Sequence, residues 1–143
     1  MPVPDPDTWR ARWASADQHR LGVHAGVVAD GFASFVIDLP YGDERDSDPL
    51  FASAALTYAA DVAALSAVLA RLDEEREQPN GTASLHLNFV RPPSGTVTIE
   101  ARVSAWGVQD ALVECSGRDG EGQLVMQGLV TYSLRARTAG VRV

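Results

Sequence analysis

The chain has 143 residues, 45% of them hydrophobic and 22% charged, which is the composition of one ordinary folded domain and excludes a disordered or fibrous protein. Its formal net charge of -7 opposes the phosphate contacts that carry nucleic-acid binding, so we expect no nucleic-acid partner. All 12 basic residues are arginine, which excludes a Schiff-base lysine, a P-loop lysine and a Ser-Lys dyad. We expect a single domain over residues 1–143.

Cysteine and histidine are too sparse for a disulfide framework or a metal site. Cys115 is the only cysteine, and His19 and His24 lack ligand spacing to any cysteine or carboxylate cluster. The first 13 residues carry prolines and acids where a secretory signal would need an apolar run. We therefore expect no metal, a cytoplasmic location, and a Cys115 that only fills space in a strand.

The N-terminal third predicts one short helix and one hairpin. Residues 5–16 place two tryptophans four positions apart on one face, which is typical of a short amphipathic helix. Two segments rich in β-branched residues, about 20–29 and 32–39, flank Asp30 and Gly31. Because Asp-Gly favours a two-residue hairpin turn, these segments are predicted to be paired strands.

A long central helix is predicted over about residues 53–77. Alanine, leucine, arginine and glutamate dominate this segment, and no glycine or proline interrupts it before Pro79. Residues 50–70 are also apolar enough to suggest a membrane span, with one charge at Asp61. Alanine and serine form its bulk, and a carboxylate in lipid costs about 2.5 kcal/mol or more, so we expect a helix buried in protein and no membrane partner.

Four further strands are predicted after the helix. Alternating apolar and polar residues, separated by turn clusters, predict an antiparallel meander over about residues 82–90, 96–106, 111–118 and 123–135. With the first hairpin this gives six strands and one dominant helix, without the βα alternation that builds a parallel sheet. The predicted fold class is α+β, an antiparallel sheet wrapped round one long central helix.

Asp61 is the most informative residue of the predicted helix. Apart from Tyr58, it is the only ionisable side chain between residues 49 and 71. Helical spacing puts Thr57 and Leu65 on its face, so the carboxylate has hydroxyls and an apolar patch as neighbours. Two interpretations stay open: a structural acid that points outward or bonds a neighbouring hydroxyl, or a general base or nucleophile in an apolar cleft.

Three segments, taken in order, carry a family resemblance: AALTYAADVAAL in the helix, then SLHLNFVRPPSGTVTIEARVSAWG, and finally GQLVMQGLVTYSL. Over about residues 20–135 the chain resembles the hotdog-fold thioesterase superfamily, nearest to the phenylacetic-acid-pathway type of acyl-CoA thioesterase. The resemblance implies a hotdog fold and a helix carboxylate that activates water or attacks the thioester carbonyl. Asp61 falls at that position.

The resemblance also implies an oxyanion site and a water-orienting hydroxyl. In such enzymes a backbone N–H at the start of the helix polarises the carbonyl, and counting back from Asp61 leads to Ser53 and Ala54. The common family pattern is His-Gly-Gly where this chain has Ala52, Ser53 and Ala54, which adds Cβ atoms beside the donors. Thr82 falls where several relatives place a Ser or Thr that helps to orient the water, or it is a strand-edge hydroxyl without a special role.

The substrate-binding candidates each have a structural alternative. Tyr58 and Leu65 either line an acyl tunnel or fill the core. His86 and Asn88 share one side of a strand, near the acyl or pantetheine channel or in a packing or dimer contact. Arg91 either meets a cofactor phosphate or is a solvated surface charge.

The function that the resemblance implies is hydrolysis of an acyl-CoA or acyl-carrier-protein thioester. Coenzyme A or phosphopantetheine enters as part of the substrate, so no other cofactor is expected. We expect a homodimer or a dimer of dimers, because six strands and one helix leave sheet edges uncovered. The alternative is a catalytically silent hotdog subunit that binds acyl chains or serves assembly. A hydratase is disfavoured, because it needs a histidine near the helix start and none occurs between His24 and His86.

Overall fold

The structure, a computed structural model, describes residues 22–39, 49–93 and 95–138. The predicted N-terminal helix over residues 5–16 lies outside these ranges. The described elements, in chain order, are β1 (Val23–Ala29), β2 (Phe32–Asp38), α3 (Pro49–Arg71), β3 (Glu77–Phe89), β4 (Thr96–Trp106), β5 (Asp110–Arg118) and β6 (Leu124–Ala136).

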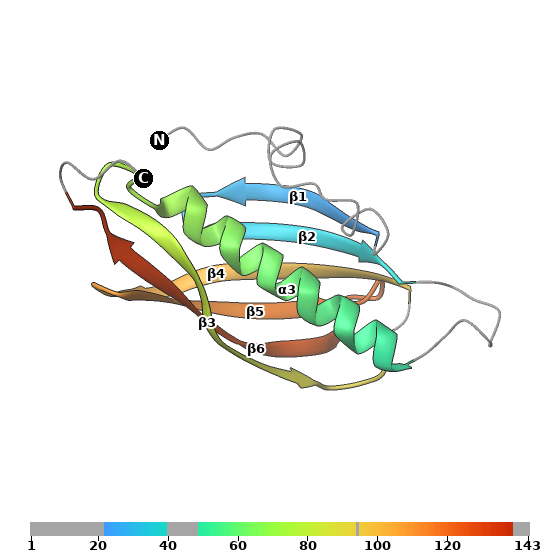
Figure 1. The fold of residues 1–143 in the computed structure, drawn as a ribbon. Coiled ribbons are helices and arrows are strands. Elements are labelled where there is room, and N and C mark those ends of the chain that lie inside the picture. Colours follow the sequence, from blue (N-terminus) through green and yellow to red (C-terminus); the bar gives the residue numbers. More distant parts are fainter. Residues whose placement is uncertain (1–21, 40–48, 94, 139–143) are drawn as a thin grey trace.

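The six strands form one antiparallel sheet in the order β1-β2-β4-β5-β6-β3, and the sheet curves round α3 (Figure 1). The α+β class and all six predicted strands are therefore confirmed. The predicted meander is wrong for one strand, because β3 pairs with β6 at the sheet edge and not with β4. Alternation along β3 identifies a strand with one apolar face, but that pattern is equally compatible with any antiparallel neighbour.

The first hairpin has the predicted two-residue connection. Ala29 pairs with Phe32 across the turn, and Gly31 has a φ of 67°. A side chain is strained in that left-handed conformation, which explains why glycine occupies the position. The turn fixes the register of β1 on β2, and β2 continues the sheet onto β4.

The core lies between α3 and the concave face of the sheet. Most of the buried residues of α3 are alanines, and they pack against inward-facing apolar residues of β4 and β5 such as Val97, Ile99 and Val113. The small side chains let the helix approach the sheet closely, so that the thiol of Cys115 lies 3.9 Å from the Ala60 carbonyl oxygen. Residues 52–71 are long and apolar enough to cross a membrane, but they form the core helix of this sheet domain, as predicted.

Both predicted ends of the helix differ from the structure. The helix begins at Pro49 and not at 53, a start consistent with the preference of proline for the first helical turn. It ends at Arg71 and not at 77, and a separate turn follows it at Asp73. The Asp73 carboxylate accepts a hydrogen bond from the Glu75 N–H at 3.1 Å, and its carbonyl accepts one from the Glu77 N–H at 2.8 Å.

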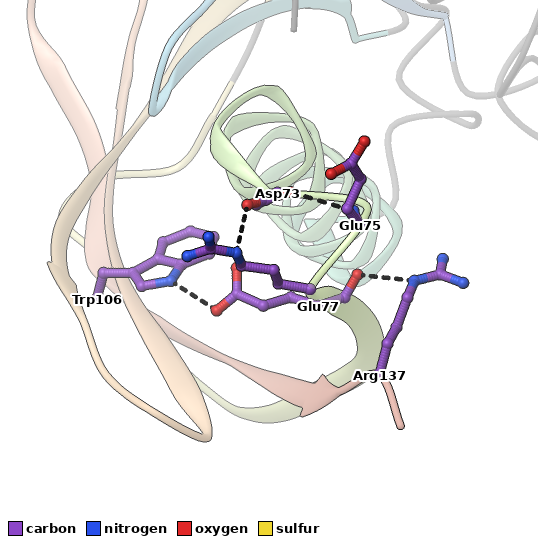
Figure 2. Close-up of polar contacts among 6 residues, drawn as sticks. Asp73, Glu75, Glu77, Trp106 and Arg137 are labelled. Carbon is purple, nitrogen blue, oxygen red and sulfur yellow. Dashed lines mark hydrogen bonds and ion pairs between the residues drawn. The ribbon is translucent and has the colours of Figure 1, made fainter. Parts of the chain in front are cut away.

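Tertiary contacts then hold the chain in a strand where local propensity favours a helix (Figure 2). The Trp106 indole donates to the Glu77 carboxylate at 3.2 Å, and Arg137 donates to the Glu77 carbonyl at 3.2 Å. The Arg71 guanidinium lies over the Trp106 ring, 5.3 Å from its centroid. These contacts join the helix end to β4 and β6 and direct β3 along the sheet edge.

Candidate active site

One face of α3 stays partly open where the sheet does not cover it. Within residues 55–70 every residue is buried except five that recur at helical spacing and are half-buried: Thr57, Tyr58, Asp61, Val62 and Leu65. We call these five the open stripe. Its only formal charge is the carboxylate of Asp61, flanked one turn away on either side by Tyr58 and Leu65. The structure therefore brings three of the predicted site residues onto one apolar, partly accessible surface.

Thr82 is the fourth predicted residue at this place. Its hydroxyl donates a hydrogen bond to Asp61 Oδ1 at 2.6 Å, joining β3 to the middle of the helix. The Thr57 hydroxyl instead donates to the Ser53 carbonyl at 2.8 Å, one turn back along the helix. Asp61 is thus held through a side chain on the neighbouring strand. That bond engages one carboxylate oxygen.

Two buried groups on the sheet lie near the Asp61 carboxylate. Burial raises the pKa of the Cys115 thiol to about 12, and the negative charge of Asp61 contributes to the rise. Burial also raises the pKa of Tyr132, again with a contribution from Asp61, while a hydrogen bond from the Gly81 backbone opposes the rise. Both groups keep their protons at neutral pH, and a thiol of this kind is no nucleophile, in agreement with the space-filling role expected of Cys115.

Ser53 and Ala54 lie two turns before Asp61, toward the N-terminal end of α3. Because the helix begins at Pro49, their N–H groups fall in its second turn, where a regular helix supplies carbonyl partners four residues back. The N–H groups of Ser53 and Ala54 would be free donors only if the helix began at residue 53, as the sequence predicts. The positive end of the helix dipole nevertheless lies on this side of Asp61.

His86 and Asn88 lie on the outer face of the sheet, opposite α3. They line an open pocket there with residues of β5 and β6 that include Glu114, Arg118 and Gln127. Arg91 follows the end of β3, and its guanidinium donates a hydrogen bond to the Gln123 side chain. Within one chain these three residues are therefore not brought together with Asp61. Among the described residues, no group of three or more His, Cys, Asp or Glu side chains is placed to hold a metal ion.

Tyr132 is the residue near Asp61 that sequence reasoning missed. Val130, Tyr132 and Leu134 alternate along β6 and are all buried, so the tyrosine faces the helix. The sequence does show that Tyr132 shares the apolar face of a regular strand with Val130 and Leu134, which predicts a phenol that faces the helix. What the sequence lacks is the pairing of β6 with β3, which sets Tyr132 opposite Thr82.

No protein-family model matches the sequence, and a search of curated proteins finds no match. Solved structures do match. A mutant of thioesterase PA1618 from Pseudomonas aeruginosa has a TM-score of 0.80 at 18% identity, with 96% of this chain and 98% of that chain covered. Thioesterase HI1161 from Haemophilus influenzae has a TM-score of 0.79 at 17% identity, with coverages of 94% and 93%. The PaaI protein from the phenylacetic acid degradation operon of Escherichia coli has a TM-score of 0.69 at 17% identity, with coverages of 92% and 91%.

These similarities define the class of fold. An antiparallel six-stranded sheet wrapped on one long helix is the hotdog fold, and this chain shares it with thioesterase structures that include PaaI. The predicted fold and the predicted structural resemblance are confirmed. At identities below 25% the likeness concerns the fold, so the chemistry has to be argued from the residues round Asp61.

Proposed function

We propose that the protein is an acyl thioesterase that hydrolyses an acyl-CoA or acyl-carrier-protein thioester, with Asp61 as general base or nucleophile. The observation that carries the proposal is a carboxylate in the middle of an apolar, partly open helix face, held by the Thr82 hydroxyl at 2.6 Å. An apolar surface with one oriented carboxylate suits a substrate that combines an acyl chain with an electrophilic carbonyl.

As a general base, Asp61 takes a proton from a water molecule while the water oxygen attacks the thioester carbonyl carbon. The C–S bond of the tetrahedral intermediate then breaks, and the departing sulfur receives the proton that Asp61 holds. The products are a carboxylic acid and a thiol, and the carboxylate is restored. The fixed Thr82 bond leaves the second oxygen of Asp61 for the water.

The oxyanion of that intermediate needs a positive potential at the N-terminal side of Asp61. Ser53 and Ala54 lie on that side, but their N–H groups already have carbonyl partners within the helix, so we assign the stabilisation to the positive end of the helix dipole and not to free donors at these residues. As nucleophile, Asp61 would instead form an acyl anhydride that water hydrolyses. Single turnover in ¹⁸O-labelled water identifies the nucleophilic route when water attacks the Asp61 carbonyl of the anhydride, because label then enters the Asp61 carboxylate. Attack at the acyl carbonyl labels only the released acid, as the general-base route does.

Thiol release from a series of acyl-CoA thioesters, together with one acyl-carrier-protein substrate, tests the proposed activity. Hydrolysis of any of them above the uncatalysed rate supports it, and no hydrolysis of any of them rejects it. Tight binding without turnover would support the alternative, a catalytically silent acyl-binding subunit. The observation that favours this alternative is Ala52-Ser53-Ala54 in place of His-Gly-Gly. We prefer the enzyme because Thr82 binds one oxygen of Asp61 while the carboxylate stays on a partly open apolar helix face.

Replacing Leu65 by tryptophan tests whether the open stripe binds the acyl chain. Leu65 is half-buried and lies one turn beyond Asp61, so a larger side chain should shorten the preferred acyl chain and leave turnover of short thioesters intact. If Leu65 belongs to the core instead, overpacking should cost roughly 1 to 3 kcal/mol and lower the melting temperature without changing the chain-length profile. Leu112→Trp, on an exposed position of β5, is the matched control.

We also propose that two chains, or two pairs of chains, assemble in the cytoplasm and share their sites. β3 is an edge strand whose Leu85 and Leu87 are only half-buried and whose Phe89 is 40% exposed, so a partner would bury apolar surface there. The proposed substrate contacts of His86, Asn88 and Arg91 would require such a partner, because in one chain they lie away from Asp61.

Light scattering at micromolar concentration measures the assembly. The expected mass is twice or four times the chain mass of 15.3 kDa. A monodisperse monomer would rule out the shared site and would leave His86, Asn88 and Arg91 without a part in substrate binding.

A further inference from the structure

The open stripe ends one turn beyond Asp61, on the C-terminal side. Leu65 is its last half-buried residue. Helical spacing puts three further residues on the same face, and all three are buried: Val68 is 0% exposed, Leu69 is 7% exposed and Leu72 is 4% exposed. We call these three residues the end wall. The accessible helix face beyond the carboxylate is therefore short.

The fold of a single chain closes the helix face at this point. After Arg71 the chain turns at Asp73 and begins β3 at Glu77, whose carboxylate accepts a hydrogen bond from the Trp106 indole at 3.2 Å (Figure 2). Arg137, which follows β6, donates to the Glu77 carbonyl at 3.2 Å. These contacts fix the turn and the start of β3 next to the last turn of α3. A partner chain would add a side to the open stripe but would not lengthen it, because the end wall is already buried within one chain.

The two sides of Asp61 differ in polarity, which sets the direction of a bound substrate. Toward the N-terminus the open stripe carries the hydroxyls of Thr57 and Tyr58, and the positive end of the helix dipole lies beyond them. Toward the C-terminus it carries only the aliphatic side chains of Val62 and Leu65. The developing oxyanion is favoured on the first side, and an acyl chain is favoured on the second.

The length of the aliphatic side limits the size of the acyl chain. Asp61 and Leu65 are four residues apart, which is about 6 Å along a helix. Because helical side chains lean toward the N-terminus, Leu69 covers the surface directly beyond Leu65. An extended chain of C–C bonds advances roughly 1.3 Å per carbon, so about five carbons beyond the thioester carbonyl reach the end wall.

We propose that the site takes short acyl thioesters, of about six acyl carbons or fewer, whose chain runs from Asp61 past Leu65 and stops at Leu69. Leu69 is then a residue that determines specificity. This inference rests on the proposed function for turnover, but the size limit applies equally to a subunit that only binds acyl chains.

A series of acyl-CoA thioesters from acetyl to palmitoyl tests the size limit. We expect kcat/KM to be highest at about six carbons or fewer and to fall about tenfold or more from hexanoyl to octanoyl, because each methylene that does not fit loses its contacts in the site. A parental preference for decanoyl or longer thioesters would overturn the size limit and leave the proposed function standing.

Leu69→Ala tests the end wall directly. Removing most of this side chain should raise kcat/KM for the octanoyl thioester, relative to the butanoyl thioester, about tenfold or more. Leu65→Ala, at a half-buried position, should shift the profile in the same direction with less loss of core packing. Leu56→Ala is the matched control, since Leu56 is fully buried on the opposite side of the helix from Leu65 and should keep the parental profile. An unchanged profile in both Leu69→Ala and Leu65→Ala would overturn the proposal.

Calorimetric titration with non-hydrolysable thioether analogues of the same chain lengths gives a readout without turnover. Affinity should rise up to about six acyl carbons and fall beyond them. If the parent protein hydrolyses no thioester but binds short analogues more tightly than long ones, the size limit holds and the proposed hydrolysis alone fails. Neither turnover nor binding of any chain length would reject both.

Discussion

Asp61→Asn is expected to lower kcat/KM for thioester hydrolysis by about 10²-fold or more and to leave the fold intact. Asparagine has the shape of aspartate and can still accept the Thr82 hydrogen bond through its amide oxygen. It cannot take a proton from water or attack a carbonyl. The melting temperature should stay the same or rise, because a partly buried charge is removed.

Asp30→Asn is the matched control. Asp30 is exposed in the turn between β1 and β2, and asparagine before glycine suits the same turn, so activity should remain parental. The thiol-release assay can be used directly, because the buried Cys115 keeps its proton at neutral pH. Parental hydrolysis by Asp61→Asn with an unchanged melting point would return Asp61 to the structural interpretation.

The sequence predicts which segments form strands and the helix better than it predicts which strands are paired in the sheet. Period-two alternation and turn residues predict six strands, and Asp30-Gly31 places the first hairpin. The position of β3 at the sheet edge depends on side chains that meet only in the folded protein. The helix end shows the same limit, since residues 73–77 favour a helix locally, whereas Asp73, Trp106 and Arg137 hold them in a turn and a strand.

The residues of the candidate site also fall into those that the sequence predicts and those that it does not. Tyr58, Asp61 and Leu65 could be placed together from the sequence because helical spacing alone puts them on one face. Thr82 was reached only through the family resemblance, and Tyr132 was not reached at all. Both depend on how β3 and β6 are paired, and that pairing contains register shifts that no alternation pattern encodes.

Gly128→Ala is expected to destabilise the protein by roughly 3 kcal/mol or more, because its Cβ would meet backbone atoms of β3, which cannot move aside as the Leu87 side chain can. A Cβ at this position falls inside the contact distance of the His86 carbonyl oxygen and lies 2.8 Å from Leu87 Cα. The added atom would push β3 away from β6. Thermal or urea unfolding measures the loss, and for a domain of this size the melting temperature should fall by about 10 °C.

Gly120→Ala is the matched control, since no atom lies within 4 Å of its Cβ position. That variant should keep its stability or gain up to about 1 kcal/mol, because alanine restricts the unfolded chain. A parental melting curve for Gly128→Ala would mean that β3 does not approach β6 so closely. Thr82 reaches Asp61 from this same edge strand, so Gly128→Ala should also lower the rate of thioester hydrolysis. Gly120→Ala should not lower that rate.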